Sequence, residues 1–267
     1  MTTEPKTLLL TREDGVLWIR LNRPDHGNGI DPVMTVELRT TFEEADADPA
    51  VRSLVLTGVG KDFCTGADLV ATPAKSPGGT VPPLDYRRSM AKYQDLFRIY
   101  WELETPVVSA VNGTIAGAGW MLGLLADLVV AAEGARWIHV FARRGMVPHA
   151  GDPFFLPRVL PFHKLNEAAM LGERFTSETL HEWGAVNRLV PADEVEATAR
   201  DVAVKLAAGP TRSLGQTKRL YRRSLVSDMA TSFSEEASAT ALISQTHDRV
   251  EGVQSLIEGR RANFTGE

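Results

Sequence analysis

Residues 106–123 read PVVSAVNGTIAGAGWMLG. An apolar strand, a turn of glycine and alanine and the start of a helix follow one another in this run. Such a turn exposes backbone N–H groups at a helix start, where they can bind a negatively charged group. A second small-residue turn, at residues 63–69 (FCTGADL), follows the strand predicted at residues 53–57. The two turns can therefore direct two N–H groups at one oxygen atom.

Composition limits the classes of protein to consider. The chain has 267 residues, 43% of them hydrophobic and 24% charged, which predicts a globular protein with one large domain or a core with a smaller helical appendage. The net charge of -5 argues against a nucleic-acid partner. The single cysteine, Cys64, excludes an internal disulfide and a cysteine-based zinc cluster, so we expect no metal and a cytoplasmic location. No signal segment or apolar run of about 20 residues predicts a membrane anchor.

Turn and helix signals divide the first half of the chain. Asp14-Gly15 between two apolar runs predicts a hairpin, and Asp31-Pro32 predicts the start of a helix. Prolines and glycines mark residues 72–83 as a surface loop. Residues 85–103 have the spacing of an amphipathic helix. Its apolar face, which we expect in the core, consists of Met90, Tyr93, Phe97 and Tyr100.

The second half changes character near residue 191. Before it, buried strands such as residues 127–132 alternate with turns and helices, which predicts an α/β fold with helices outside the sheet. After it, four helices follow without strands. We expect a core at residues 1–191 and a helical region at residues 192–267 that covers a cleft or forms an oligomer contact. The expected helices span residues 192–207, 211–225, 229–244 and 248–257.

Paired backbone N–H groups suit the stabilisation of an oxyanion. Preorganised donors lower the energy of charge that develops on a carbonyl oxygen, and losing one donor costs about 3 kcal/mol. Glycine and alanine let a substrate approach the backbone closely. The alternative is that Gly117, Ala118 and Gly119 only allow tight packing of a helix on a strand. The presence of two such turns favours the functional interpretation.

A series of motifs resembles the crotonase (enoyl-CoA hydratase/isomerase) family from about residue 7 to the end. They are LNRP at 21–24, FCTGADL at 63–69, the segment 112–127, GMVPHAG at 145–151, LPR at 156–158, EWGAVN at 182–187 and RRANF at 260–264. The resemblance implies a spiral of ββα units, a C-terminal helical trimerisation region, and a homotrimer or hexamer. It also implies an acyl-CoA substrate, without a further cofactor, whose thioester oxygen meets the N–H groups of Ala67 and Ala118.

The same resemblance shows a departure from the hydratases. These enzymes use two glutamates to activate water and protonate the substrate, and the matching positions hold Met121 and Phe141. Neither side chain exchanges protons. Isomerases of the family often carry a carboxylate after the proline of a Gly-x-x-Pro segment, where this chain has His149. Imidazole titrates near neutral pH, so we hypothesise that His149 is the acid–base residue; the alternative is that it only lines the pocket. Asp152 is a second candidate, as a base or to orient His149, or it only stabilises a turn.

Contacts with the CoA portion rest on four residues. Arg23 and Lys61 are candidate cations for its phosphates, with ordinary surface solvation as the alternative. The resemblance implies backbone contacts from Asp68 and Leu69. Cys64 has no adjacent base and fits packing better than nucleophilic catalysis.

Two other classes of function remain open. The spacing Gly117-x-Gly119-x-x-x-Gly123, with Glu133 downstream, loosely resembles a nicotinamide-dinucleotide motif, although that pattern alone is weak. The absence of both glutamates also fits an acyl-CoA-binding protein without catalytic activity. Otherwise, isomerisation is the easier reaction for this chain, because moving a double bond needs proton transfer but no added water.

Overall fold

The computed structural model describes residues 5–71 and 83–267, so most of the loop predicted at residues 72–83 lies outside the described residues. The larger of its two sheets has six strands in the order β1-β2-β3-β5-β7-β10. Only the β1–β2 pair is antiparallel among the pairs of this sheet. The strands are β1 (Leu8–Glu13), β2 (Val16–Leu21), β3 (Ser53–Gly58), β5 (Val107–Val111), β7 (Leu128–Ala132) and β10 (Arg188–Val190).

A second, four-stranded sheet carries both small-residue turns, in the strand order β4-β6-β8-β9. Strands β4 and β6 and strands β6 and β8 pair in parallel, and β9 is antiparallel to β8. The strands are β4 (Asp62–Cys64), β6 (Thr114–Ala116), β8 (Arg136–Ile138) and β9 (Arg174–Thr176). Each turn therefore follows two consecutive strands, one from each sheet, and leads toward a helix.

The run at residues 106–123 thus contains two strands where the residue pattern predicted one. Strand β5 ends at Val111, and the chain turns at Asn112 and Gly113 before β6. The Asn112 side chain accepts a hydrogen bond from Gly58 N–H and donates one to the Gly60 carbonyl. A Cβ atom on Gly113 would lie 2.0 Å from the Lys61 oxygen, so only glycine fits this close approach.

The predicted N-terminal hairpin and helix start are confirmed. Asp14 and Gly15 have φ of 52° and 75°, as the tight turn between β1 and β2 requires. The Asp31 side chain accepts a hydrogen bond of 2.7 Å from Met34 N–H, and Pro32 is the first residue of α1 (Pro32–Ala47).

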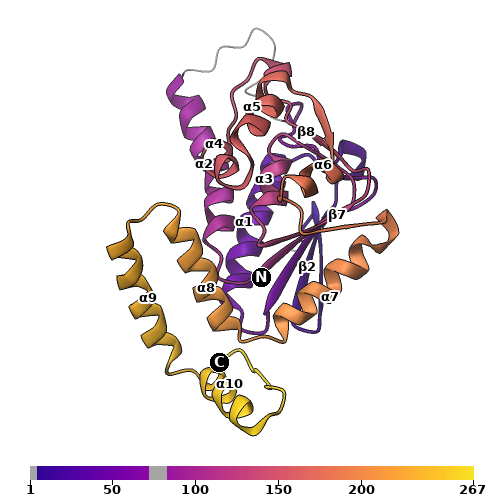
Figure 1. Ribbon diagram of the computed structural model, residues 1–267. Coiled ribbons are helices and arrows are strands. Elements are labelled where there is room, and N and C mark those ends of the chain that lie inside the picture. Colours follow the sequence, from indigo (N-terminus) through magenta and orange to yellow (C-terminus); the bar gives the residue numbers. More distant parts are fainter. Residues whose placement is uncertain (1–4, 72–82) are drawn as a thin grey trace.

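Helices cover both faces of the six-stranded sheet (Figure 1). Helices α1, α2 (Pro83–Glu102) and α3 (Gly119–Leu124) share one core with alternate strand residues such as Leu54 and Leu56. Helix α7 (Val195–Ala207) covers the other face and packs on residues such as Val55. Because side chains of a strand alternate between its faces, the central strands serve both cores.

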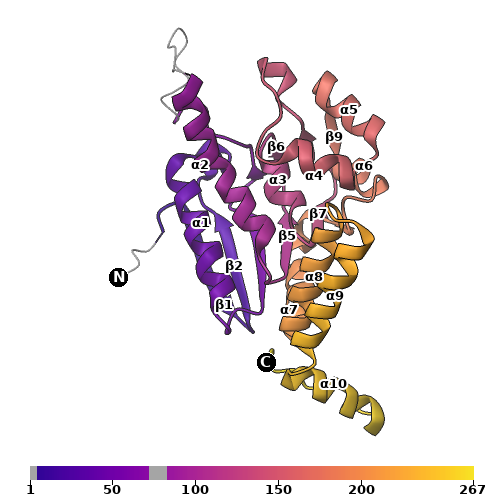
Figure 2. The ribbon, with the colours of Figure 1, turned by 90° about the vertical axis from the view of Figure 1, so that its left-hand side faces the viewer.

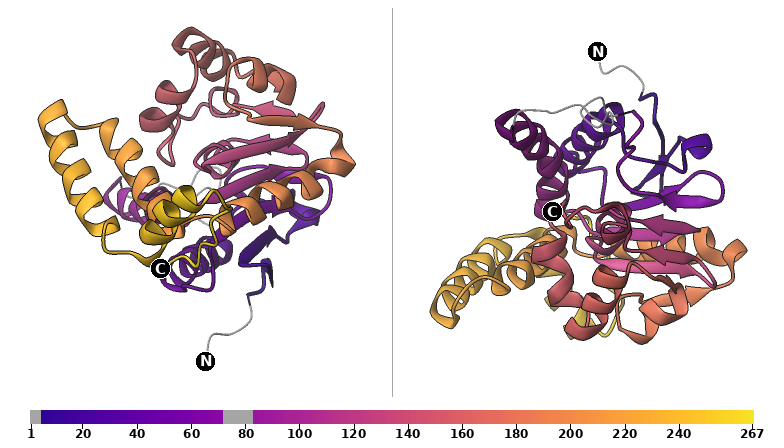
Figure 3. Two further views of the ribbon diagram at one scale, coloured as in Figure 1. Left: turned by 60° about the horizontal axis from the view of Figure 1, so that its bottom comes forward. Right: turned by 90° about the horizontal axis from the view of Figure 1, so that it is seen from above.

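The remaining helices surround the second sheet or extend from the core. Helices α4 (Asp152–Val159), α5 (Phe162–Leu171) and α6 (Ser177–Glu182) lie on the side of β8 and β9. At the C-terminus, α8 (Thr211–Ser224) and α9 (Met229–Ile243) lie side by side, with α9 farther from the sheets and α10 (His247–Glu258) beyond them (Figures 2 and 3). Among the described residues, no helix has the length and apolar character needed to span a bilayer.

Asp127 attaches α8 to the core. Its carboxylate lies 2.8 Å from Lys218 Nζ and 3.0 Å from Arg222 Nη2. It also accepts a hydrogen bond from Val107 N–H at the start of β5. Burial lowers the pKa of Lys218 to about 8, although Asp127 opposes this shift. Helix α8 is therefore held on the core by charge pairing as well as by packing.

Candidate active site

The two small-residue turns lie against each other. Gly66 has φ of 91°, and a Cβ atom added to it would lie 3.1 Å from the Ala118 nitrogen. A Cβ atom on Gly119 would lie 2.2 Å from the Cys64 oxygen. Both glycines are therefore required for the backbones of the two turns to come this close.

The hydrogen bonds that Gly66 and Asp68 make with Ile30 leave the Ala67 N–H group pointing away from Ile30. Ile30 N–H donates to the Gly66 carbonyl at 2.8 Å, and Asp68 N–H donates to the Ile30 carbonyl at 2.9 Å. Since successive N–H groups of an extended chain alternate in direction, the N–H of Ala67 points to the opposite side. Ala118 occupies the N-cap position of α3, whose N–H has no partner within the helix. Within residues 5–71 and 83–267, neither N–H donates to a protein oxygen.

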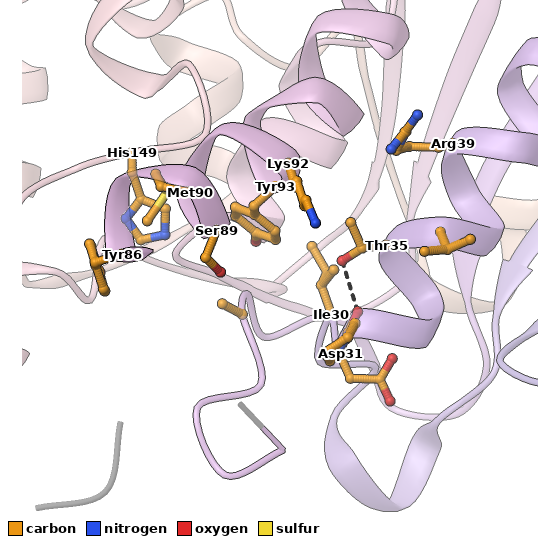
Figure 4. A pocket seen from close by; sticks show the side chains of 13 residues that line it. Ile30, Asp31, Thr35, Arg39, Tyr86, Ser89, Met90, Lys92, Tyr93 and His149 are labelled. Atoms are coloured by element: carbon orange, nitrogen blue, oxygen red, sulfur yellow. Dashed lines mark hydrogen bonds between the residues drawn. The ribbon is translucent and has the colours of Figure 1, made fainter. Parts of the chain in front are cut away.

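Two cavities meet at these turns. A small one, of about 10 Å³, is lined by both turns and by Phe141 and His149. A larger one, of about 270 Å³, lies between α1 and α2 (Figure 4). Ala67 and His149 line both cavities. A substrate whose carbonyl group lies at the turns could therefore extend its acyl chain into the larger cavity.

His149 is half-buried at this junction. Its ring centroid lies 4.8 Å from that of Phe141 and 5.9 Å from that of Tyr93. Its Nδ1 lies 3.4 Å from the Val147 oxygen. Ala150 follows with φ of 64°, so the chain bends sharply behind the imidazole before α4 begins.

The two positions at which the family resemblance predicts glutamates in a hydratase are apolar and buried. Phe141 is 3% exposed and lines the small cavity with both turns. Met121 is fully buried and lines a neighbouring cavity of about 230 Å³ together with Phe97 and Phe154. No carboxylate therefore reaches the turns from these positions.

Asp152 is paired with a different histidine from the one proposed. Its Oδ2 lies 2.7 Å from Nε2 of His139, and both side chains are buried. Asp152 is the first residue of α4, while His139 follows β8. The expectation that Asp152 orients His149 directly is not supported, because the Asp152 carboxylate is paired with His139. The backbone of Asp152 still bonds to His149, whose carbonyl accepts its N–H at 3.3 Å.

Arg23 binds protein carboxylates. Its guanidinium lies 2.9 Å from Asp68 and 3.4 Å from Asp31, and its side chain is 13% exposed. Burial raises the pKa of Asp68, but hydrogen bonds from Ala71 N–H, Arg23 and Val70 N–H outweigh it and lower that pKa. Arg23 therefore holds the turn that contains Ala67. Lys61 is exposed between β3 and β4, and Leu69 is half-buried beyond the turn.

The structure adds two polar side chains that the sequence pattern assigned to no site. Tyr93 and Arg39 both line the larger cavity, and the Tyr93 hydroxyl and Arg39 Nε are buried without a partner among the described residues. Tyr93 shares its helical spacing with Phe97 and Tyr100, which are core residues. That spacing places all three on one face of α2 but does not reveal that a cavity opens beside its first turns.

Cys64 takes no direct part in the candidate site. Cys64 is fully buried, and burial raises the pKa of its thiol to about 12. In the described part of the chain, no three His, Cys, Asp or Glu side chains are grouped as metal ligands would be.

Comparison with known proteins identifies the family. The enoyl-CoA hydratase/isomerase family model matches residues 11–267. A 1,2-epoxyphenylacetyl-CoA isomerase of Escherichia coli K12 is 33% identical over 96% of this chain and 97% of its own. A carnitinyl-CoA dehydratase of Escherichia coli O157:H7 is 32% identical over 98% of this chain and 99% of its own. The crystal structure of an enoyl-CoA hydratase/isomerase from Cupriavidus metallidurans matches with a TM-score of 0.91 and 29% identity, covering 99% of this chain and 98% of the other.

These matches argue against the interpretation of Gly117, Gly119 and Gly123 as a dinucleotide-binding motif. Gly119 and Gly123 are explained by packing, since a Cβ atom on Gly123 would lie 2.7 Å from Ile115 Cδ1. The α/β architecture with two mixed sheets and C-terminal helices is that of the matched crystal structure. The chain belongs to the enoyl-CoA hydratase/isomerase family and is one of its enzymes.

Proposed function

We propose that this enzyme moves a double bond in an enoyl-CoA thioester and that His149 transfers the proton. One observation carries the proposal: of the two residues shared by both cavities, Ala67 and His149, only His149 has a side chain that exchanges protons near neutral pH. Ala67 supplies a backbone N–H at the same junction. The proton-transfer group and one oxyanion donor are thus next to each other.

The reaction would pass through an enolate. The thioester oxygen accepts hydrogen bonds from Ala67 N–H and Ala118 N–H, and each donor contributes about 3 kcal/mol to stabilising the developing negative charge. His149 removes a proton from the saturated carbon between or beside the two functional groups, which is carbon 2 of a 3-enoyl thioester or carbon 4 of a 2-enoyl thioester. The same imidazole then returns the proton to the other carbon. The substrate neither gains nor loses atoms.

The apolar residues Met121 and Phe141 support isomerisation over hydration. Adding water requires a group that activates it, and these buried side chains can neither accept nor donate a proton. Among the relatives, the names include both an isomerase and a dehydratase, each acting on a CoA ester. The site composition favours the isomerase chemistry for this chain.

For the CoA portion, we propose backbone contacts at Asp68 and Leu69. Arg23 then acts by holding this turn through its ion pair with Asp68, and the exposed Lys61 is the cation available to a CoA phosphate. No resident cofactor enters this scheme.

The proposal also covers the oligomeric state of the enzyme and its cellular compartment. We propose a homotrimer or a hexamer, in which residues 192–267 supply oligomer contacts and cover for the pocket, while residues 1–191 supply the acyl-CoA site. Large exposed apolar side chains on α9 and α10 support this assignment. The single, reduced Cys64 supports a cytoplasmic location.

Paired substrates distinguish the possible reactions. The purified protein is incubated with matched 2-enoyl-CoA and 3-enoyl-CoA thioesters, and absorbance of the conjugated thioester and product mass are recorded. We expect a shifted double bond with unchanged mass. A mass gain equal to one water would assign hydration, and absence of turnover with retained binding would contradict the catalytic proposal.

The His149 assignment is tested by His149→Gln. This variant should lose at least about a hundredfold in kcat while its affinity for an acyl-CoA changes little, because glutamine keeps much of the volume and cannot exchange protons. The exposed His163→Gln is the matched control and should retain turnover. Full turnover by His149→Gln would refute the assignment.

A further inference from the structure

Helix α8 is held on the core with little apolar packing. Its large apolar side chains are at most half-buried, and the buried positions of this fully described helix are Gly215 and Gln216. Two cavities, of about 340 and 330 Å³, are lined by residues of both α8 and the core, and Trp101 and Arg222 line both of them. Polar contacts must therefore supply much of the attachment.

One core residue, Arg52, binds the chain on either side of the C-terminal helices. Its guanidinium donates to the Gly209 carbonyl at 2.7 Å, just before α8, and to the Phe264 carbonyl at 3.2 Å, beyond α10. Residues 210–263, which we call the C-terminal arm, protrude from the core between these two points (Figure 1). The arm is thus fixed to the core at both ends, and between them Asp127 holds α8.

Two cations of α8 share one carboxylate at this joint. Lys218 Nζ and Arg222 Nη2 lie 2.8 and 3.0 Å from the Asp127 carboxylate, and the two cationic side chains are only 6% and 12% exposed. Lys218 also donates to the Thr105 carbonyl at 2.8 Å, and Arg222 donates to the Leu125 carbonyl at 3.1 Å. The joint therefore buries one positive charge more than it neutralises, and an unmatched buried charge is costly.

The other ionisable groups packed around Lys218 do not supply the missing negative charge. Asp46 of α1 accepts the Glu104 N–H at 3.0 Å, and the Glu104 carboxylate lies 3.9 Å from Arg219. The Tyr100 hydroxyl of α2 is neutral, because burial raises its pKa. In the part of the chain that the structure describes, Asp127 is the one carboxylate at ion-pair distance from Lys218.

We propose that this joint is a pH-dependent hinge of the C-terminal arm, which holds α8 more firmly once Lys218 has lost its proton. Loss of that proton removes the unmatched charge, while Arg222 keeps its ion pair with Asp127. Burial lowers the pKa of Lys218 from 10.5 to about 8. Because a detached, solvated Lys218 binds its proton more tightly, attachment is weakest below pH 8 and strengthens as the pH rises above it.

Hydrogen exchange of the α8 backbone measures the attachment. A helix of 14 residues is only marginally stable in water by itself, so a detached α8 exchanges its amide protons. Exchange is followed by mass spectrometry at pH 7 and pH 9, with correction for the intrinsic effect of pH on the exchange rate. In the natural protein, protection of α8 should rise about tenfold between these pH values. It should stay below that of β5 at both, because α8 opens without the core.

Two variants of Lys218 identify the titrating group. Lys218→Met removes the charge and Lys218→Arg keeps it at both pH values, so neither should show the rise in protection. Arg219→Met, which removes an exposed cation from the same helix, is the control and should keep the rise. The inference is overturned by a natural protein without the rise, by a rise that survives in either Lys218 variant, or by equal protection of α8 and β5. The double-bond assay tests the proposed function separately, since Lys218 lines neither cavity at the turns.

Discussion

At the residue scale, Cys64 illustrates how burial removes reactivity. Its thiol lies directly before the first turn, yet it is fully buried, and its pKa rises from 9.0 to about 12. A thiol attacks as the thiolate, so this cysteine is inert near neutral pH. Its packing against Gly119 keeps the two turns together.

The raised pKa of Cys64 makes the protein less stable in alkali. Between pH 9 and 12 the unfolded chain loses the thiol proton while the folded chain keeps it, so the free energy of unfolding falls by up to about 1.4 kcal/mol per pH unit. Urea unfolding of the natural protein and of Cys64→Ala at pH 8, 9 and 10 measures this contribution. The difference in free energy between them should decrease above pH 9; a constant difference would contradict the assignment.

At the scale of elements, the His139–Asp152 pair fixes the start of α4 relative to β8. Both side chains are buried, with Nε2 and Oδ2 2.7 Å apart, while His139 Nδ1 lacks a partner among the described residues. The segment between them contains His149, whose carbonyl accepts the Asp152 N–H. The pair therefore positions the proposed acid–base residue without contacting the cavity.

Removing the Asp152 carboxylate should loosen this segment. Asp152→Ala leaves His139 buried without any partner and should lower the free energy of unfolding by about 3 kcal/mol. Asp152→Asn retains an acceptor and should cost less. Urea unfolding measures both values, and kinetics should show a reduced kcat in Asp152→Ala with a smaller reduction in Asp152→Asn. Equal behaviour of the two variants would argue against the pairing.

At the scale of the whole molecule, the C-terminal helices leave apolar surface uncovered. Phe233 on α9 is 59% exposed, and Leu256 and Ile257 on α10 are 81% and 74% exposed. A single chain in water seldom exposes so many large apolar side chains in neighbouring helices. Burial between copies of the chain would account for them.

The assembly proposal predicts a change in mass on substitution at this surface. Sedimentation should give a trimer or hexamer for the natural protein, and the double variant Phe233→Glu, Leu256→Glu should shift the mass toward the monomer, because burying two carboxylates is costly. Lys164→Glu, a charge change on α5 outside residues 192–267, is the control and should keep the natural mass. A monomeric natural protein would refute the proposal.

Local sequence was sufficient for the family and for several of the elements. Turns and helix ends are determined by residues within a short stretch of the chain, so the sequence pattern reveals them. Examples are the Asp14-Gly15 turn, the Asp31-Pro32 helix start and the ends of α8. The small-residue turns with Ala67 and Ala118 were recognised for the same reason. Their roles as oxyanion donors, like the role of His149, stay predictions.

Contacts between distant segments were decided only by the tertiary structure. The pairing of Asp152 with His139, the attachment of Arg23 to Asp68, and the division of the apolar run into β5 and β6 each depend on what packs nearby. Tyr93 is the clearest case, because helical spacing puts it on the face of core residues and only the assembled cavity leaves its hydroxyl unpaired. Spacing specifies the face of a helix, whereas burial and hydrogen bonding depend on the elements that the fold places opposite it.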